Sequence, residues 1–251
     1  MATTQDTRDA TKPLVVKGVR FRYRGTKARD ISGQERFDLL APDFEVASRE
    51  RVLIAAKSGA GKSTLLTLVA GLDEPTKGTI HVNGTNVHSL SGAARDSFRA
   101  TNIGMIFQTF NLLQGFSAIE NVLAALLFSS VPKAEHASRA KELLTRLGIE
   151  RHDAKVEALS VGQRQRVAVA RALACGPSLV LADEPTASLD PENAAAAMDL
   201  IVESCKQAGA ALVCVSHDAG LGSRFDRTLR LEAPGSMASP TQEPLRAEVA
   251  R

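Results

Sequence analysis

The amino-acid sequence predicts an α/β fold with a mostly parallel sheet, an antiparallel β edge and an inserted α-helical subdomain. Short apolar runs that suit buried strands alternate along the 251 residues with segments of helical period. Such alternation is typical of a parallel sheet covered by helices on both faces. The stretch between about 91 and 162 departs from it, because this stretch is mostly helical, and we interpret it as an insertion into the α/β core.

The first part of the chain supplies several strands and one helix. Apolar and basic side chains alternate over 19–24, which indicates a half-buried strand whose basic outer face is solvated. Phe44 and Val46 are expected to begin another strand, a short apolar strand is expected at 51–56, and a helix with several leucines to bury is expected at 63–70. Asn83-Gly84 lies between two short apolar runs and is a strong hairpin signal.

The rest of the chain contains the helical segment, after which strands and helices alternate again. Helical spacing of apolar residues predicts helices over 118–128 and 133–147, with one strand-like exception at 103–108. The elements expected beyond it are a helix at 161–174, a strand at 179–182, a helix at 191–207 and strands at 211–215 and 228–231. Both kinds of element therefore recur at the end of the chain.

Composition and charge argue against several classes of protein, namely nucleic-acid-binding, disulfide-rich, zinc-binding and membrane-spanning proteins. A net charge of +3 is too small to indicate nucleic acid as a partner, and three widely spaced cysteines fit neither a disulfide framework nor a zinc site. No apolar run approaches the ~20 residues that span a bilayer, and the polar N-terminus is unlike a signal peptide. We expect one domain over 13–232, after a disordered lead-in at 1–12 and before a mobile tail at 233–251.

A glycine-rich segment joins the strand expected at 51–56 to the helix that follows it. The segment consists of Ala56, Lys57, Ser58, Gly59, Ala60, Gly61, Lys62, Ser63 and Thr64. Small residues let successive backbone N–H groups converge on an anion, Lys62 can reach the β- and γ-phosphates, and Ser63 can hold Mg²⁺. An ordinary glycine-rich turn is the alternative, which Gly-Lys-Ser-Thr at a strand–helix junction disfavours.

Ala56 departs from the phosphate-binding pattern, which begins with glycine. Two interpretations are open. If this position needs a positive φ, alanine costs about 1 kcal/mol there. If the backbone has a negative φ at this point, alanine fits without that cost.

Two carboxylates follow the apolar strand expected at 179–182. Ligands of open parallel sheets collect beyond the carboxyl ends of the strands. Asp183 there can accept from Mg²⁺-bound water, and Glu184 can orient an attacking water and take its proton. A solvated acidic turn closed by Pro185 is the alternative, and its weight falls because the glycine-rich segment is also present.

A third motif opens the helix expected at 161–174. Ser160 and Gln163 have the spacing of a capping box, which by itself explains the helix start. It does not explain Gly162, a poor helix former in a first turn. Glycine there lets another group approach the backbone closely, and the exposed N–H groups of a helix start suit a phosphate.

Together these segments resemble the nucleotide-binding subunit of an ATP-binding cassette (ABC) transporter, over about residues 13–232. The resemblance implies a P-loop NTPase core of the RecA-like kind, ATP and Mg²⁺ as ligands, and ATP hydrolysis. The motifs occur in the family's order: the glycine-rich segment, Gln108, Leu159-Ser160-Val161-Gly162-Gln163, Asp183 to Asp190 with Ser188, and Val215-Ser216-His217-Asp218.

The resemblance also implies roles for single residues. Tyr23 would stack on adenine, although a core residue of the first strand is the alternative. Gln108 would touch Mg²⁺ or water and relay the nucleotide state to the helical subdomain, or it is a polar residue at a strand end. His217 would contact the γ-phosphate, unless it is structural. Asp190 would lie at a dimer seam, or it caps the helix that starts at Pro191.

In this family two copies of the subunit pair head to tail, so Ser160–Gln163 of one copy would cover ATP held by the other. Val161 replaces the family's glycine in this motif. Segments after Gly71 and after Gln108 are similar to the lipoprotein-release, macrolide-export and cell-division group. The implied partner is an integral membrane permease subunit, and the implied location is the cytoplasmic face of the inner (plasma) membrane.

The surface for that membrane partner is one point on which two interpretations remain open. Phe107, Phe110 and Leu112 either line a groove for the partner or pack inside the helical subdomain.

Two rival functions of the whole chain also remain open. One is a soluble cassette protein outside transport, and the other is an ATP-gated switch with little turnover, which the departures at Ala56 and Val161 keep open.

Overall fold

The computed structural model describes residues 12–25, 37–187 and 189–232. Two predicted segments lie outside these residues: the tail at 233–251 and the lead-in at 1–12, of which only Lys12 is described. The motif residue Ser188 also lies outside them. No helix within the described ranges has the length and the apolar content to cross a bilayer.

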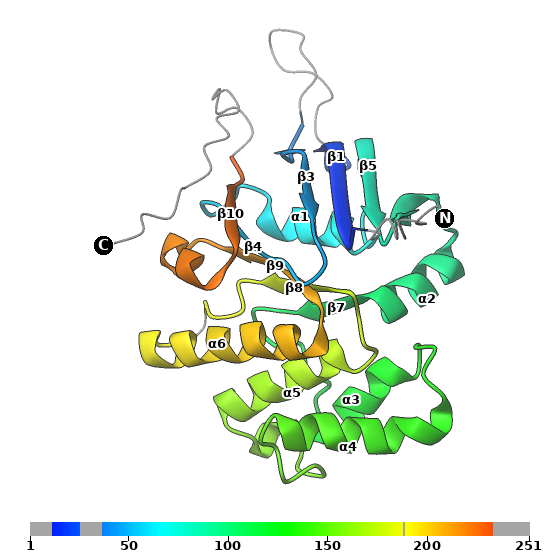
Figure 1. Cartoon of the computed structure of the whole chain (residues 1–251), viewed down its shortest axis with the longest axis vertical. Coiled ribbons are helices and arrows are strands. Elements are labelled where there is room, and N and C mark those ends of the chain that lie inside the picture. Colours follow the sequence, from blue (N-terminus) through cyan, green and yellow to red (C-terminus); the bar gives the residue numbers. More distant parts are fainter. Residues whose placement is uncertain (1–11, 26–36, 188, 233–251) are drawn as a thin grey trace, which may run out of the picture.

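A parallel sheet forms the centre of the fold (Figure 1). Its strands, in spatial order, are β10 (Arg227–Arg230), β4 (Arg51–Ala55), β9 (Ala211–Ser216), β8 (Leu179–Asp183) and β7 (Ile103–Ile106). All four pairings are parallel. The predicted parallel core is confirmed, and the strand inside the helical segment, β7, is one of its edges.

An antiparallel sheet lies on one side of this core. It consists of β1 (Leu14–Phe21), β2 (Leu39–Leu40), β3 (Phe44–Val46), β5 (Lys77–Val82) and β6 (Thr85–Asn86). Asn83 and Gly84 have φ values of 47° and 75° in the turn between β5 and β6. Both signs are those of a type I′ hairpin turn, so the hairpin predicted at this dipeptide is confirmed.

The helices are placed between and below the two sheets in Figure 1. The α-helices are α1 (Lys62–Val69), α2 (Gly92–Asn102), α3 (Ala118–Leu126), α4 (His136–Arg146), α5 (Val161–Leu173) and α6 (Pro191–Ala208). Four 3₁₀ turns are also described: η1 (Val87–Ser89), η2 (Lys133–Glu135), η3 (Val156–Ala158) and η4 (Ala219–Arg224).

The side chains of the parallel strands bury themselves in two separate cores. Leu179 and Leu181 of β8 belong to the core shared with α1 and the antiparallel sheet. Val180 and Ala182, the alternate residues of the same strand, belong to the core shared with α3, α5 and α6. Both faces of the sheet are therefore covered, which is why its strands are continuously apolar rather than alternating.

Helix ends hold the helical segment against the core. Arg166 of α5 donates from Nη1 to the carbonyl oxygen of Leu147 just beyond α4, at 2.8 Å. In return Arg139 of α4 donates from Nε to the carbonyl oxygen of Ala174 just beyond α5, at 2.5 Å. Cations at helix C-termini are favourable because they satisfy the last carbonyls and oppose the helix dipole. The two helices therefore cap each other and keep α5 in place.

Candidate functional site

The predicted motifs meet at the carboxyl edge of the parallel sheet. The glycine-rich segment follows β4, Asp183 and Glu184 end β8, and His217 follows β9. In the strand registers Ala55 lies opposite Ser216, and Asp183 lies opposite Val215. Gln108 comes two residues after β7 at the same edge. Four loops from different parts of the chain thus converge where ligands of such sheets bind.

The glycine-rich loop has left-handed backbone at two glycines. Gly59 and Gly61 have φ values of 76° and 90°. A Cβ at Gly61 would lie only 2.8 Å from Cδ1 of Leu39, so a larger residue there would also have to displace this buried leucine side chain. Ala56 is not among the described non-glycine residues with positive φ. The second interpretation of Ala56 is therefore correct: alanine fits without backbone strain, and its N–H donates to the carbonyl oxygen of Ser216 at 3.1 Å.

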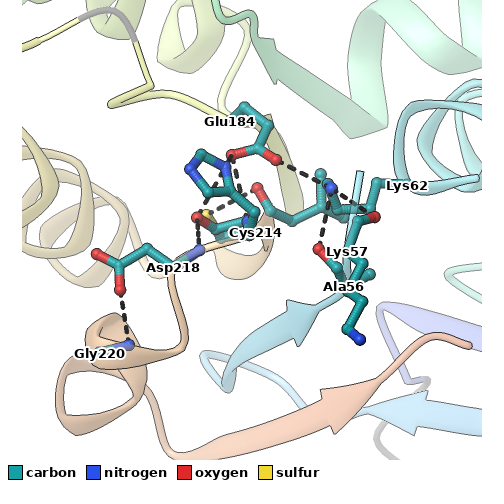
Figure 2. Close-up of polar contacts among 10 residues, drawn as sticks. Ala56, Lys57, Lys62, Glu184, Cys214, Asp218 and Gly220 are labelled. Carbon is teal, nitrogen blue, oxygen red and sulfur yellow. Dashed lines mark hydrogen bonds and ion pairs between the residues drawn. The ribbon is translucent and has the colours of Figure 1, made fainter. Parts of the chain in front are cut away.

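The ammonium group of Lys62 lies between this loop and the carboxylate of Glu184 (Figure 2). It donates to the carbonyl oxygens of Ala56 and Lys57 at 3.0 and 3.1 Å, and its Nζ is 3.2 Å from Oε1 of Glu184. The Lys62 side chain is 8% exposed. Because an ammonium has three donors, all of them are engaged. A phosphate that binds here has to replace one of these partners.

Glu184 lies between Lys62 and His217. Its carboxylate is 12% exposed, and Oε2 accepts from Nδ1 of His217 at 2.8 Å. Its backbone has a φ of 44°, a left-handed conformation that costs a non-glycine residue about 1 kcal/mol. The N–H of Glu184 donates to Val215 at 3.0 Å, which ties this conformation to β9. The two candidate catalytic groups, Glu184 and His217, are therefore in direct contact.

Asp183 carries an acceptor without a partner. Burial raises the pKa of its carboxyl group; a hydrogen bond from Ser63 and the charge of Lys62 oppose the rise, and the charge of Glu184 adds to it. Oδ1 is buried and accepts no hydrogen bond from the described residues. Carboxylate and hydroxyl oxygens are the ligands that Mg²⁺ prefers. Asp183 and Ser63 are thus suited to hold a divalent cation.

The raised pKa of Asp183 predicts that Asp183→Asn stabilises the metal-free protein. A raised pKa means that the folded protein favours the neutral carboxyl of the wild type. The stability that this neutral carboxyl contributes is fully present below the ordinary aspartate pKa of about 4. It is lost as the pH rises through the higher folded-state pKa. At pH 7 we expect the variant to have a higher Tm than the wild type, because its amide carries no charge to desolvate. Thermal unfolding in EDTA measures this difference.

Two further measurements test whether desolvation of the Asp183 carboxylate destabilises the metal-free protein. Below pH 4 the melting temperatures of Asp183→Asn and the wild type should converge, because both carry a neutral group there. Added Mg²⁺ should raise the Tm of the wild type more than that of the variant. A variant that is less stable than the wild type in EDTA at pH 7 would contradict the desolvation argument.

Tyr23 lies beside the glycine-rich loop rather than in a core. Its side chain is 51% exposed, and its ring meets Phe21 edge to face with centroids 4.9 Å apart. Its hydroxyl shares a hydrogen bond of 2.5 Å with Oγ1 of Thr64 in α1. The alternative of a core residue is therefore wrong. An exposed ring next to a phosphate-binding loop is available for stacking on a base, which keeps the adenine role as a prediction.

The Ser160–Gln163 motif begins α5 and forms the predicted capping box. The side chain of Ser160 accepts from the N–H of Gln163 at 3.2 Å, and that of Gln163 accepts from the N–H of Ser160 at 2.9 Å. The space around the Cα of Gly162 is open, and Val161 is 44% exposed. No hydrogen bond within the described chain joins this motif to the glycine-rich loop. A single copy therefore leaves the motif outside the site.

The remaining predicted residues divide between surface and interior. Gln108 is exposed, and Asp190 caps α6 by accepting from the N–H of Asn193 at 3.1 Å. Phe110 and Leu112 are each 8% exposed and belong to the core around α3 and α5. A groove role is therefore wrong for these two residues.

Sequence reasoning missed the apolar side chains that reach the surface of the helical segment. Leu113 and Phe116 are 41% and 48% exposed. Leu127 and Phe128, at the end of α3, are 65% and 70% exposed. The signal was present in the run after Gln108, but periodicity does not say which member of a loop points outward.

Comparison with known proteins shows which family this chain resembles. The sequence model of a family described as ABC transporter matches residues 39–187, which contain the glycine-rich loop, Gln108, the Ser160 motif and the two carboxylates. The lipoprotein-releasing system ATP-binding protein LolD of Chromohalobacter salexigens is 42% identical over 193 residues, 76% of this chain and 81% of its own. LolD of Xanthomonas oryzae pv. oryzae is 44% identical over 190 residues, 75% and 78% of the two chains.

Solved structures show the same fold. The ATP-binding cassette MJ0796, in a dimeric post-hydrolysis state bound to ADP and Pi, superposes with a TM-score of 0.74 at 32% identity, covering 88% of this chain and 96% of that one. The cbiO1 protein of Clostridium perfringens, part of the ABC transporter complex cbiONQ, superposes with a TM-score of 0.75 at 27% identity, covering 89% and 87%.

Proposed function

Because this chain belongs to the ABC transporter family and is the ATP-binding subunit of such a transporter, we propose that it hydrolyses ATP to drive a membrane partner. The observation that carries the proposal is the edge of the parallel sheet. There a phosphate-binding loop, a carboxylate with an orphaned buried oxygen and a carboxylate–histidine pair lie together. These are the parts that phosphoryl transfer to water requires.

Each side chain has a separate task in this proposal. The N–H groups of the glycine-rich loop and Lys62 bind the β- and γ-phosphates. Ser63, Asp183 and Gln108 hold the magnesium site, which when filled neutralises developing charge on the phosphates. Glu184 orients the attacking water and accepts its proton. His217 contacts the γ-phosphate and, through its hydrogen bond, holds the carboxylate of Glu184 in place.

Phosphate binding and catalytic readiness are coupled in this geometry. The carboxylate of Glu184 and a bound phosphate would compete for the same ammonium, because Nζ of Lys62 lies 3.2 Å from Oε1 of Glu184. When phosphates take over Lys62, the carboxylate loses this partner and becomes a better acceptor for a water proton. ATP binding thus converts Glu184 from an ion-pair partner into a base.

The complete site requires a second copy of the chain. The Ser160 motif lies away from the glycine-rich loop within one copy, and MJ0796 forms a dimer of cassettes. In a head-to-tail pair, Ser160 and Gly162 of one copy would close over the γ-phosphate held by the other. The hydroxyl proton of Ser160 is available for this contact, because its oxygen only accepts in the capping box. Val161 would lie at that seam.

The membrane partner is an integral permease subunit that carries the bilayer span. The relatives named lipoprotein-releasing system ATP-binding protein support extraction of a lipoprotein as the work done. Leu113 and Phe116, exposed near Gln108, suit an apolar contact with that partner. Such an arrangement places this chain on the cytoplasmic face of the inner (plasma) membrane.

Mixing two inactive variants tests the composite site. Lys62→Ala removes the phosphate-binding ammonium, and Ser160→Arg obstructs the motif that should close over ATP. Each variant alone should lack ATP turnover. In a mixed dimer, the intact loop of one copy meets the intact motif of the other. Random pairing then restores up to about a quarter of wild-type turnover, since half of the dimers are mixed and each has one intact site of two.

The control is a mixture in which one chain carries both substitutions and the other is Lys62→Ala, which has no intact loop anywhere. Turnover is measured as phosphate release with Mg²⁺ and ATP. Full activity of Ser160→Arg on its own would show that one copy suffices. Absence of recovery in the first mixture, with both variants folded, would contradict the head-to-tail arrangement.

A further inference from the structure

Two neighbouring residues behind Gln108 have a backbone conformation that their side chains disfavour. Phe110 and Asn111 have φ values of 61° and 47°. Left-handed backbone costs a non-glycine residue about 1–2 kcal/mol, and asparagine tolerates it better than phenylalanine. Such a pair persists only when surrounding contacts hold it. The contacts around this turn therefore identify what fixes its shape.

One contact comes from a helix about 60 residues further along the chain. Arg171 of α5 donates from Nη1 to the carbonyl oxygen of Asn111 at 2.6 Å and from Nη2 to that of Phe110 at 2.7 Å. The two prongs of the guanidinium thus hold the carbonyls of the two strained residues. A lysine has no planar fork and does not present two donors in this geometry.

The environment of Arg171 shows that this contact is its main role. The guanidinium is partly buried, and burial lowers its pKa. No carboxylate of the described ranges pairs with Arg171. Desolvating a cation without an acidic partner is costly, and the two carbonyls together with the C-terminal turn of α5 are what offset it.

The held turn also determines where Gln108 lies. The N–H of Phe110 donates to the carbonyl oxygen of Phe107 at 3.1 Å, so Gln108 and Thr109 occupy the centre of a tight turn. On the upstream side, β7 fixes this turn in the parallel sheet. On the downstream side, Phe110 packs in the core and Arg171 holds the main chain. Both ends of the turn are therefore anchored.

Arg171 connects this turn to the motif at the other end of the same helix. α5 runs from Val161 to Leu173, so it is a rigid rod about 20 Å long with Ser160 at its start and Arg171 in its last turn. A displacement of the Gln108 turn is thus transmitted to the rod through the two hydrogen bonds of Arg171. The same bonds transmit motion of the rod back to the turn.

We propose that Arg171 is a positioning residue for ATP hydrolysis, which holds the Phe110–Asn111 turn so that Gln108 and the Ser160 motif move as one unit. This inference rests on the proposed function only in its activity readout. The two hydrogen bonds that Arg171 donates both go to main-chain carbonyls of this turn. Arg171 acts through the turn, and its loss should leave the glycine-rich loop unchanged.

The test compares four single variants and one double variant of the full-length chain. Arg171→Met removes the fork, Arg171→Lys keeps the charge, and Asn111→Val attacks the same turn with a β-branched residue that disfavours positive φ. Arg146→Met is the matched control, since Arg146 is an exposed arginine of α4 paired with Glu142. Amide hydrogen exchange of peptides over 107–114 and 56–66 is measured without nucleotide, together with the Kd for ATP and turnover against Mg²⁺ concentration.

We expect Arg171→Met to raise exchange over 107–114 by about tenfold, with 56–66 unchanged. Turnover should fall between about tenfold and a hundredfold and need more Mg²⁺, while the Kd for ATP stays within about twofold. Arg171→Lys should be intermediate, and Arg146→Met should behave as the wild type. Arg171→Met with Asn111→Val should cost less than the two single effects combined, because both act on one turn.

Each failure has a distinct meaning. Unchanged exchange over 107–114 in Arg171→Met, or full rescue by lysine, would overturn the role of the fork. Equal loss of ATP affinity and turnover would overturn it as well, because this pattern indicates general damage to the fold. If the wild type itself does not hydrolyse ATP, the proposed function fails while the exchange measurement still decides on the turn. If Arg171→Met does not fold, Arg171→Lys and Asn111→Val supply the same comparison.

Discussion

Glu184→Gln should abolish steady-state ATP hydrolysis while leaving ATP binding intact. Glutamine has the shape of glutamate but does not accept a proton from water. Loss of a general base costs about 10²–10⁴ in turnover. The amide keeps the hydrogen bond to His217 but ends the ion pair with Lys62. Lys62 is then released for phosphate, so the Kd for ATP should not rise.

The oligomeric state should change together with the activity. With hydrolysis blocked, ATP should hold two copies in a closed dimer that ADP does not support. Phosphate release and light scattering after size exclusion, each with ATP and with ADP, measure the two effects. Glu203→Gln, an exposed position on α6, is the matched control and should resemble the wild type. Undiminished turnover, or a monomer in ATP, would count against Glu184 as the base.

The fold was predictable because its signals are local and regular. Apolar runs such as 179–182 are buried on both faces, and this pattern follows directly from a parallel sheet between two cores. Asn83-Gly84 specifies a turn through its own backbone preferences. The glycine-rich loop is likewise defined by residues that are adjacent in the chain, so its place after β4 could be predicted.

The contacts that organise the site could not be predicted in the same way. Lys62 and Glu184 are far apart in the sequence, and only the register of β4, β9 and β8 brings them together. The left-handed backbone of Phe110 has no sequence signal, because phenylalanine disfavours it and Arg171 supplies the compensation from another helix. The amino-acid composition does not predict that a residue of a distant helix stabilises a strained turn.

The sequence also did not predict which apolar side chains lie at the surface. Tyr23 continues the apolar alternation of β1, yet its ring lies at the surface because the strand ends at Phe21. In the run after Gln108, Leu112 is buried and Leu113 is exposed, although both are leucines. Residues in loops lack the periodicity that assigns a face to a strand or helix residue.

Lys62→Met should weaken nucleotide binding and also destabilise the protein, and these two effects have separate causes. The methionine keeps the apolar stem but offers phosphate no donor. Loss of charge-assisted hydrogen bonds worth about 1.5–3 kcal/mol each should weaken ATP binding by about tenfold to a hundredfold or more. Destabilisation of about 1–3 kcal/mol is expected because Glu184, 12% exposed, is left without its cation.

A second substitution separates the two effects. In Lys62→Met with Glu184→Gln, the carboxylate that paired with Lys62 is replaced as well, so stability should return most of the way towards the wild type. ATP binding should not return, because phosphate still has no ammonium to bind. Urea unfolding and equilibrium dialysis with ATP measure the two quantities on the same samples. If the double variant is as unstable as Lys62→Met alone, the ion pair with Glu184 is not what Lys62 contributes to folding. The loop carbonyls of Ala56 and Lys57 would then be its principal partners.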